Sequence, residues 1–425
     1  MLKELPKTLD ETYERILRDI HEANRDHAHR LLQCLAVAVR PLRIAELAEV
    51  LAVDFRTTCR GESSKLNTEW RWEDQQDAVL SICSSLISVV DEEGSQIVQF
   101  SHFSVKEFLT SSRITGSSAD ISPFRILLES AHTVLAKACL AVLLRLGGVV
   151  DEHNVEDNFP LARYAAEHWV DHARFENVSS HVREGMEDLF DPDKPYFGAW
   201  LQVYDIDIRP VSDPHFYLRL QYFDTRPLKA SLPAIPLYYA ALCGFHELAE
   251  QLIIKYPQQV NATSGYFVSP LGVALQGGHL KCAQVLLERG ADVDVQANCD
   301  YTPLLGASCT GHSEIVQWLL SHRANPNHRG KIIGWISLHG AAFYGHVEVS
   351  RLLLQYKADV NARDNRGRTP LHIASQCDQV DVARLLLEHG VDVNAQDKKG
   401  RTAFQVASDL GYHDVAKLVS DHGSE

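Results

Sequence analysis

Two histidines, His168 and His172, lie four residues apart in a stretch that is predicted to be helical. That spacing places two imidazoles on one face of a helix, an arrangement that supplies two of the ligands in many zinc sites. Glu167 and Asp171 lie beside them, but no HExxH motif is formed and the sequence offers no third ligand. A partly exposed helix face is therefore the preferred interpretation, and we predict no metal site.

Motifs for nucleophilic catalysis and phosphate binding are incomplete as well. The segment GASCTG at 306–311 does not satisfy G-x-S-x-G, and it falls at the position of a repeated helix. No GxxxxGK[ST] loop occurs in the sequence, since Gly330-Lys331 is followed by two isoleucines. No nucleophile, base and oxyanion donor come together. The sequence therefore predicts a protein that is not an enzyme, with no catalytic residue and no cofactor.

The chain is organised around a short repeat in its C-terminal half. The stretch from Gly367 to Asn394 predicts a turn, a short helix, a reversal and a second helix. Thr369 is placed to cap the first helix, and Pro370 suits its first turn. Equivalent dipeptides recur at steps of 33 or 34 residues: Thr302-Pro303, Ile336-Ser337, Thr369-Pro370 and Thr402-Ala403. A unit this short cannot bury its apolar face alone, so the period predicts stacked neighbours.

This period, together with the segments TPLH, GH, LL and ADVN, resembles the ankyrin repeat. About six units are expected over 235–425, the first and last being the least regular, as capping units are. The resemblance implies that His339 and His372, at the TPLH position, bond to backbone between units. The predicted fold class is mainly α, with an α-solenoid at the C-terminal end.

Residues 1–118 are predicted to form a winged helix, with helices over 9–22, 29–39, 44–51 and 78–88 and a β-hairpin over 87–100. Residues 119–190 read as a packed helical spacer. Seven of the sixteen prolines fall between Asp191 and Pro236, so 191–234 is predicted to be a linker. Its aromatic residues, Phe197 and Trp200 among them, are expected to pack on the first repeat unit.

Three segments carry a more specific resemblance: LPKTLDETYERIL (Leu5–Leu17), PLRIAELAEVLAVD (Pro41–Asp54) and FSHFSVKEFLTSSRI (Phe100–Ile114). They are similar to the winged helix, often labelled GPI inositol-deacylase-like, of fungal NACHT-type STAND proteins, which are NLR-like. Residues 159–205 are similar to the spacer in the same family. There a nucleotide-binding NACHT domain precedes the winged helix. Its ATPase activity is not carried over to a sequence without a P-loop, and the resemblance implies the sensor or regulatory end of such a protein.

His102, in the segment FSHFSVKEF, is the residue with an implied nucleotide role. In NLR-type relatives a histidine in a similar F-x-H motif reaches the phosphate of bound ADP, and here that role could operate only in trans. The alternative is a histidine that orders the wing against the following helix, with Ser101 or Ser104 nearby. We favour this alternative, because position alone does not make a site.

Charge and cysteine usage limit the compartment and the partners. Residues 1–120, 121–232 and 233–425 carry net charges of −6, −6 and −3, so no segment offers the basic stripe that nucleic acid requires. The start has no apolar core typical of a signal peptide, and the longest apolar run, around 138–144, is too short for a bilayer. Nine scattered cysteines read as reduced thiols. The sequence predicts a cytoplasmic protein with no membrane and no nucleic-acid partner.

In a repeat array of this kind, ligands bind at the hairpin tips and on the exposed positions of the inner helices, which line a concave groove. Aromatic and arginine residues at those positions are the best candidates for binding hot spots. The predicted protein-binding residues are Tyr301, Trp335, Phe343, Tyr344, Arg366, Arg368, Lys399 and Arg401. For Phe343 and Tyr344, packing against the adjacent repeat is an equally good interpretation.

Three functions stay open on the sequence alone. The preferred one is a protein-interaction scaffold with a protein ligand in the groove. The second is the regulatory part of a NACHT ATPase switch whose nucleotide-binding domain is missing from this sequence. The third, DNA binding by the winged helix, is disfavoured by the net charge of −6 in residues 1–120.

Overall fold

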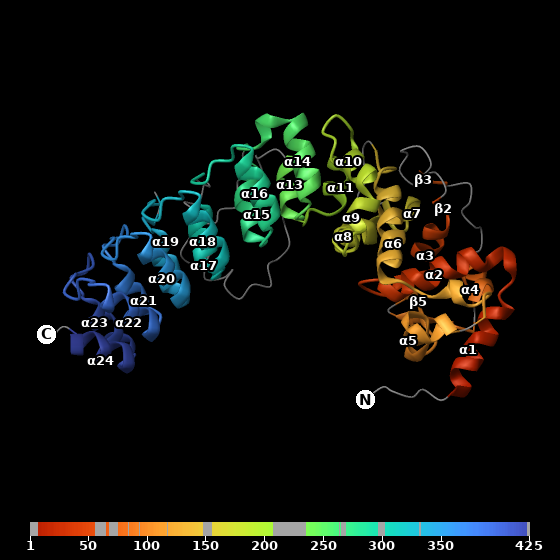
Figure 1. Ribbon diagram of the computed structural model, residues 1–425, viewed down its shortest axis with the longest axis horizontal. Coiled ribbons are helices and arrows are strands. Elements are labelled where there is room, and N and C mark those ends of the chain that lie inside the picture. Colours follow the sequence, from red (N-terminus) through yellow and green to blue (C-terminus); the bar gives the residue numbers. More distant parts are fainter. Residues whose placement is uncertain are drawn as a thin grey trace. The chain divides into compact units, whose positions relative to one another are not determined.

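The computed structural model describes residues 7–55, 65–67, 75–83, 85–92, 94–116, 118–147, 155–206, 235–262, 264, 269–295, 302–330 and 333–422 (Figure 1). These residues fall into two compact units, 1–209 and 210–425. Among them, no helix combines the length and the apolar character needed to cross a bilayer.

The first unit begins with the predicted winged helix. Its helices are α1 (Lys7–Asp19), α2 (Arg25–Val37), α3 (Ile44–Leu51), α4 (Gln75–Cys83) and α5 (Phe103–Thr110). Its main sheet has the order β1-β5-β4, formed by Leu42–Arg43, Ser95–Phe100 and Ile87–Glu92. The wing is the antiparallel hairpin β4–β5, in which Val89 pairs with Val98. Both the helices and the hairpin therefore follow the sequence prediction.

Two details of this domain differ from the prediction. The helix expected over 78–88 ends at Cys83, because the backbone from Ile87 onward is bonded into the hairpin. Strand β1 and the small sheet of β2 (Val53–Asp54) with β3 (Lys65–Leu66) were not predicted. Strands of two residues are too short to show an alternating pattern, which explains why they escape a search by periodicity.

The helical spacer follows the winged helix. Its elements are α6 (Leu128–Leu143), α7 (Val155–Asn158), α8 (Ala162–Ala173), α9 (Val178–His181), α10 (Arg183–Leu189) and α11 (Tyr196–Val203). Helix α6 packs against both α2 and α8. The buried carboxylate of Glu49, on α3, accepts a hydrogen bond of 2.7 Å from the N–H of Leu161, just before α8. Winged helix and spacer thus share one core.

Phe197 and Trp200 correct the prediction made for the segment after Asp191. Both are buried on α11 within the spacer, where the indole of Trp200 donates to the backbone oxygen of Ala166 at 3.1 Å. Its ring also lies 5.4 Å from that of Trp169. These aromatics complete the core of α8 and α10 in place of covering the first repeat. Residues 207–234, with the rest of the predicted linker, lie outside the described residues.

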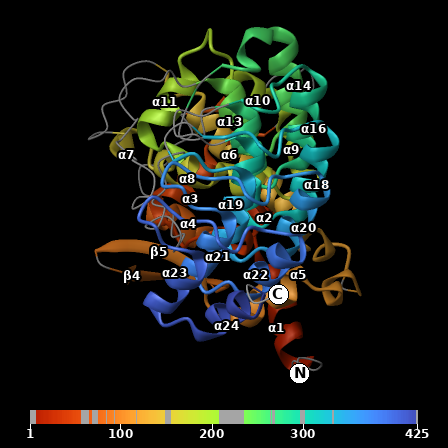
Figure 2. The same ribbon diagram turned by 90° about the vertical axis from the view of Figure 1, so that its left-hand side faces the viewer.

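The second unit is a stack of helix pairs, six of them within the described part of 235–422. They are α13/α14 (Pro236–Leu242, His246–Lys255), α15/α16 (Pro270–Gln276, Leu280–Glu288), α17/α18 (Pro303–Thr310, Ser313–Ser321), α19/α20 (Ser337–Tyr344, Val347–Gln355), α21/α22 (Pro370–Gln376, Val380–Glu388) and α23/α24 (Ala403–Leu410, His413–His422). The first helices form one row and the second helices another, as Figure 2 shows. The predicted number of units is confirmed.

Local sequence explains why each pair folds alike. Hydroxyls of Thr302, Thr369 and Thr402 accept backbone N–H groups in the first turn of α17, α21 and α23. Proline is the first residue of α17 and α21. The loops that follow the second helices join neighbouring units to each other. Asn327, after α18, accepts the N–H of Asp359, after α20, at Oδ1 with a distance of 2.7 Å. Asn361 Oδ1 accepts the N–H of Asp392 in the same way, at 2.8 Å.

Candidate protein-binding surface

Two buried histidines position the tips of the array. His339, on α19, accepts the N–H of Ile336 at Nδ1 and donates from Nε2 to the backbone oxygen of Arg368 at 3.1 Å. His372, on α21, bonds in the same way to the oxygen of Arg401 at 3.0 Å. Burial lowers the pKa of His339 to about 4, so the imidazole is neutral at pH 7, as an accepting Nδ1 requires. The prediction that these residues tie one unit to the next is confirmed.

A buried aspartate shapes each of the last two tips. Asp364 Oδ1 accepts the N–H groups of Arg366 and Arg368 at 2.8 Å, and its Oδ2 accepts Nε of Arg368 at 2.8 Å. Asp397 repeats the pattern with Lys399 and Arg401. Burial opposes ionisation of Asp397, but the hydrogen bonds from Arg401 and Lys399 outweigh it and lower the pKa. The tips are thus rigid loops built around a carboxylate.

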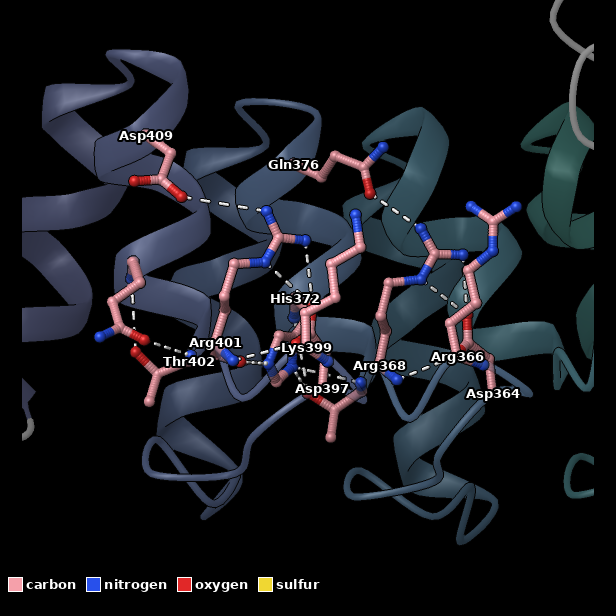
Figure 3. A network of polar contacts seen from close by, with 12 residues as sticks. Asp364, Arg366, Arg368, His372, Gln376, Asp397, Lys399, Arg401, Thr402 and Asp409 are labelled. Atoms are coloured by element: carbon pink, nitrogen blue, oxygen red, sulfur yellow. Dashed lines mark hydrogen bonds and ion pairs between the residues drawn. The ribbon is translucent and has the colours of Figure 1, made fainter.

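A pocket of about 460 Å³ lies between these tips and the inner helices α21 and α23 (Figure 3). It is lined by Asn365, Arg366, Arg368, Gln376, Asp397, Lys398, Lys399, Arg401, Val406, Asp409 and Leu410. Pockets of about 300–1,000 Å³ are the usual size for ligand sites. Figure 3 shows Arg366, Arg368, Lys399 and Arg401 extending from the tips in one direction, toward the side where Gln376 and Asp409 lie.

Four of the predicted binding residues line this pocket, and they differ in exposure. Arg366 and Lys399 are exposed, and the side chain of Arg401 is 38% exposed beside Asp397. Arg368 is only 6% exposed, because its guanidinium is paired with Asp364 and also donates to Gln376 Oε1 at 2.8 Å. Arg368 therefore belongs to the frame of the pocket more than to its open surface.

The aromatic candidates lie apart from the pocket. Trp335 was expected at an exposed tip but is only 2% exposed, because its ring packs 5.6 Å from that of Phe343 and stacks near His339. This expectation of exposure is wrong. Phe343 and Tyr344 are half-buried at the end of α19, with ring centroids 4.9 Å apart. Tyr301 lies outside the described residues.

The pocket also contains residues that the sequence analysis did not select. Val406, Asp409 and Leu410 come from α23, the inner helix of the last unit. A signal was available, since Asp409 and Leu410 hold the positions in the last unit that Gln376 and Cys377 hold in the unit before it. They were missed because the last unit was treated as a cap.

Comparison with known proteins agrees with this architecture. Residues 237–330, 307–397 and 338–425 match the ankyrin repeat family, and residues 14–122 match the family described as GPI inositol-deacylase, winged helix domain. The chain is a winged-helix protein with ankyrin repeats. The pocket described above is therefore part of the ankyrin groove, between the fifth and sixth units.

Several curated proteins are similar to this chain. The azaphilone pigments biosynthesis cluster protein L of Monascus ruber is 36% identical over 310 residues, which cover 69% of this chain and 61% of that protein. The chain thus spans less than two thirds of the length of this relative. The ankyrin repeat protein nuc-2 of Neurospora crassa is 33% identical over 90 residues, covering 21% of this chain and 8% of that protein. A probable E3 ubiquitin-protein ligase of rice, XBOS33, is 44% identical over 78 residues, covering 18% and 15% of the two chains.

His102, in the winged helix, caps α5. Its Nδ1 accepts the N–H of Ser104 at 3.3 Å and lies 2.5 Å from the hydroxyl of Ser104. That hydroxyl is in turn 2.6 Å from the hydroxyl of Tyr13, on α1. The ordering role that the sequence analysis favoured for His102 therefore has a defined set of partners.

His168 and His172, the candidate metal pair, point to different surroundings. His172 is fully buried, with Nδ1 2.9 Å from Nδ1 of His132 and Nε2 2.9 Å from the hydroxyl of Tyr164. Burial, with a smaller contribution from His132, lowers the pKa of His172 to about 4. Neutral His172 can then accept from Tyr164 and donate to His132. No cluster of potential metal ligands is found in the part of the chain that the structure describes.

Proposed function

We propose that this protein is a non-enzymatic interaction scaffold that binds a protein ligand in the groove of its ankyrin array. The observation that supports this most directly is the pocket between the last two tips and helices α21 and α23. It is framed by rigid, hydrogen-bonded loops and carries both charged and apolar side chains, which is the composition of a recognition surface.

A capture experiment with paired variants tests this function. The groove pair Tyr344→Ala and Leu410→Ala removes two side chains from the inner helices. The control pair Ile254→Ala and Tyr356→Ala removes exposed side chains of similar size from the second helices or their ends. Proteins retained by the purified chain from a lysate of its source organism would be identified by mass spectrometry. We expect at least one partner to be lost with the groove pair and kept with the control pair.

Retention of every partner by the groove pair would contradict the proposal. Thermal unfolding of both variants controls for misfolding, because Tyr344 is half-buried and contacts Phe343. If the groove pair unfolds early, Leu410→Ala alone is the fallback, since Leu410 is 51% exposed.

We further propose that the chain is the sensor or regulatory end of a STAND-type protein, with the winged helix as docking site for a nucleotide-binding module in trans. The winged-helix match over 14–122 supports this. Under this proposal His102, exposed at the start of α5, would meet the nucleotide only in the joined complex. Calorimetry of the purified chain with ADP should then show no binding, and binding abolished by His102→Ala would instead reveal a nucleotide pocket within this chain.

A further inference from the structure

The pocket in the ankyrin groove carries a local charge opposite to that of the chain. Five cationic side chains line it, namely Arg366, Arg368, Lys398, Lys399 and Arg401. Three carboxylates lie among them, those of Asp364, Asp397 and Asp409, which leaves a net charge of +2. The whole protein has a net charge of −15. A basic pocket attracts ligands of negative charge, even on a protein whose net charge is negative.

Two of the five cations are used to build the tips. Arg368 pairs with Asp364 at 2.8 Å, and Arg401 pairs with Asp397 at 3.0 Å and lies 3.9 Å from Asp409. Their charges are largely compensated within the chain, so they contribute geometry and hydrogen-bond donors more than unmatched charge.

The other three cations are different. Within the described part of the chain, the side chains of Arg366, Lys398 and Lys399 form no hydrogen bond and no ion pair, and all three residues are exposed. Their backbones are nevertheless fixed, because Asp364 and Asp397 hold Arg366 and Lys399, and the N–H of Lys398 donates to the oxygen of Arg366 at 2.9 Å. The charges therefore stand on a preorganised frame, which lowers the entropic cost of binding.

The inner side of the pocket carries apolar side chains beside Gln376 and Asp409. Leu410 is 51% exposed there, and Val406 lies buried next to it on α23. A large exposed apolar side chain beside unpaired cations suits a ligand that has carboxylates and an apolar group close together. A nucleic-acid backbone fits less well, because it needs a longer row of cations.

We propose that this pocket binds an extended acidic segment of a partner protein. Aspartate or glutamate side chains of the segment pair with Arg366, Lys398 and Lys399, while a neighbouring apolar side chain contacts Leu410. The proposal rests on the proposed function, since it gives the chemical class of the ligand for the same groove.

Fluorescence anisotropy with the full chain tests the proposal. The probe is a short labelled peptide with several glutamates around a leucine, compared with a matched peptide in which glutamine replaces each glutamate. We expect the glutamate peptide to bind about tenfold or more tightly than the glutamine peptide, and this preference to shrink between about 50 and about 200 mM salt.

Variants locate the binding. Arg366→Gln with Lys399→Gln should weaken binding of the glutamate peptide about tenfold, because two charge-assisted contacts are lost. Neither side chain has a partner in the chain's described part, so the fold should be retained. The matched control, Arg384→Gln with Lys417→Gln, changes the net charge equally at exposed positions on α22 and α24, outside the pocket. It should leave the affinity unchanged.

Three results would overturn the proposal. They are equal affinity for the two peptides, equal weakening by the pocket and control variants, and displacement of the peptide by a single-stranded oligonucleotide of the same charge at lower concentration. The proposed function can survive this failure. If a captured partner is lost with Tyr344→Ala and Leu410→Ala but kept with Arg366→Gln and Lys399→Gln, then the groove binds protein without selecting for acidity.

Discussion

Individual buried polar residues set the geometry of the ankyrin tips. His339 and His372 reach the backbone of the next tip, and Asp364 and Asp397 each hold a loop from within. Each of these bonds is made by a side chain with little access to water, where an unmatched polar group would be costly. The tips are consequently the part of the array where single substitutions should have the clearest effects.

His339 makes the stability of the array depend on pH. Its folded-state pKa of about 4 lies below the value of about 6.5 of an unfolded histidine. Between these values the unfolded chain binds more protons at this residue, so the contribution of His339 to the free energy of unfolding rises as pH increases from about 4 to about 6.5 and is constant above that range. Asp364 favours the charged imidazole, while Arg368 and Arg329 disfavour it.

Urea unfolding at several pH values measures this dependence. His339→Gln should reduce its slope by up to one proton, about 1.4 kcal/mol per pH unit, in that range. His172 in the spacer has a similarly low pKa, so the slope should be followed by a probe within the repeats. An unchanged slope in the variant would mean that His339 is not the group responsible.

The choice of site residues shows how far sequence alone reaches at this scale. Arg366 and Lys399 were found because the repeat period places them at tips. Trp335, one step of 33 residues before Arg368, also belongs to a tip but folds inward onto Phe343, and periodicity does not report the direction of a side chain. Leu410 was missed for a different reason. The last unit is irregular in sequence, so its groove positions were not compared with those of the other units.

At the scale of elements, glycines at the ends of the first helices control how closely units stack. Gly311 ends α17 with φ of +77°, and a Cβ built there would lie 2.6 Å from the ring of His346. His346 in turn lies with Nε2 3.1 Å from the backbone oxygen of Cys309. Gly411 ends α23 with nearly the same φ, +78°, but a Cβ there would meet no atom within 4 Å.

Substitutions at Gly311 and Gly411 distinguish the cost of backbone strain from the cost of a steric clash between units. Gly411→Ala should lower the free energy of unfolding by about 1 kcal/mol, the usual cost of a left-handed alanine. Gly311→Ala should lower it by about 2–4 kcal/mol, because displacement of His346 adds to that cost. Equal losses in urea unfolding would show that contact with His346 contributes nothing to the interface between units.

The elements also show which parts of the fold are determined by local sequence. Caps, prolines and apolar faces recur in each repeat, so the helix pairs could be read from the sequence. The wing was visible because both strands are long enough to alternate. The placement of Phe197 and Trp200 could not be predicted from the local sequence. Their partners Phe190, Trp169 and Ala166 belong to other elements of the spacer, so the contacts depend on tertiary packing.

At the scale of the whole molecule, two compact units with different architectures share one chain. The winged helix and spacer form a continuous core that includes buried Glu46 and Glu49. The ankyrin array repeats a simple unit and concentrates unpaired cations at its last two tips. The ankyrin repeats support a protein-interaction role for the second unit, and the first unit carries the winged-helix match.

The groove claim is tested most directly by site-specific photo-crosslinking in the source organism. A photoreactive amino acid would be placed at position 410, in the pocket, and separately at position 254, where exposed Ile254 lies on α14. We predict that position 410 gives a discrete crosslinked adduct with a partner protein, that position 254 does not, and that Arg366→Gln with Lys399→Gln reduces the adduct. Adducts of equal yield at both positions, or at position 254 alone, would contradict binding in the groove.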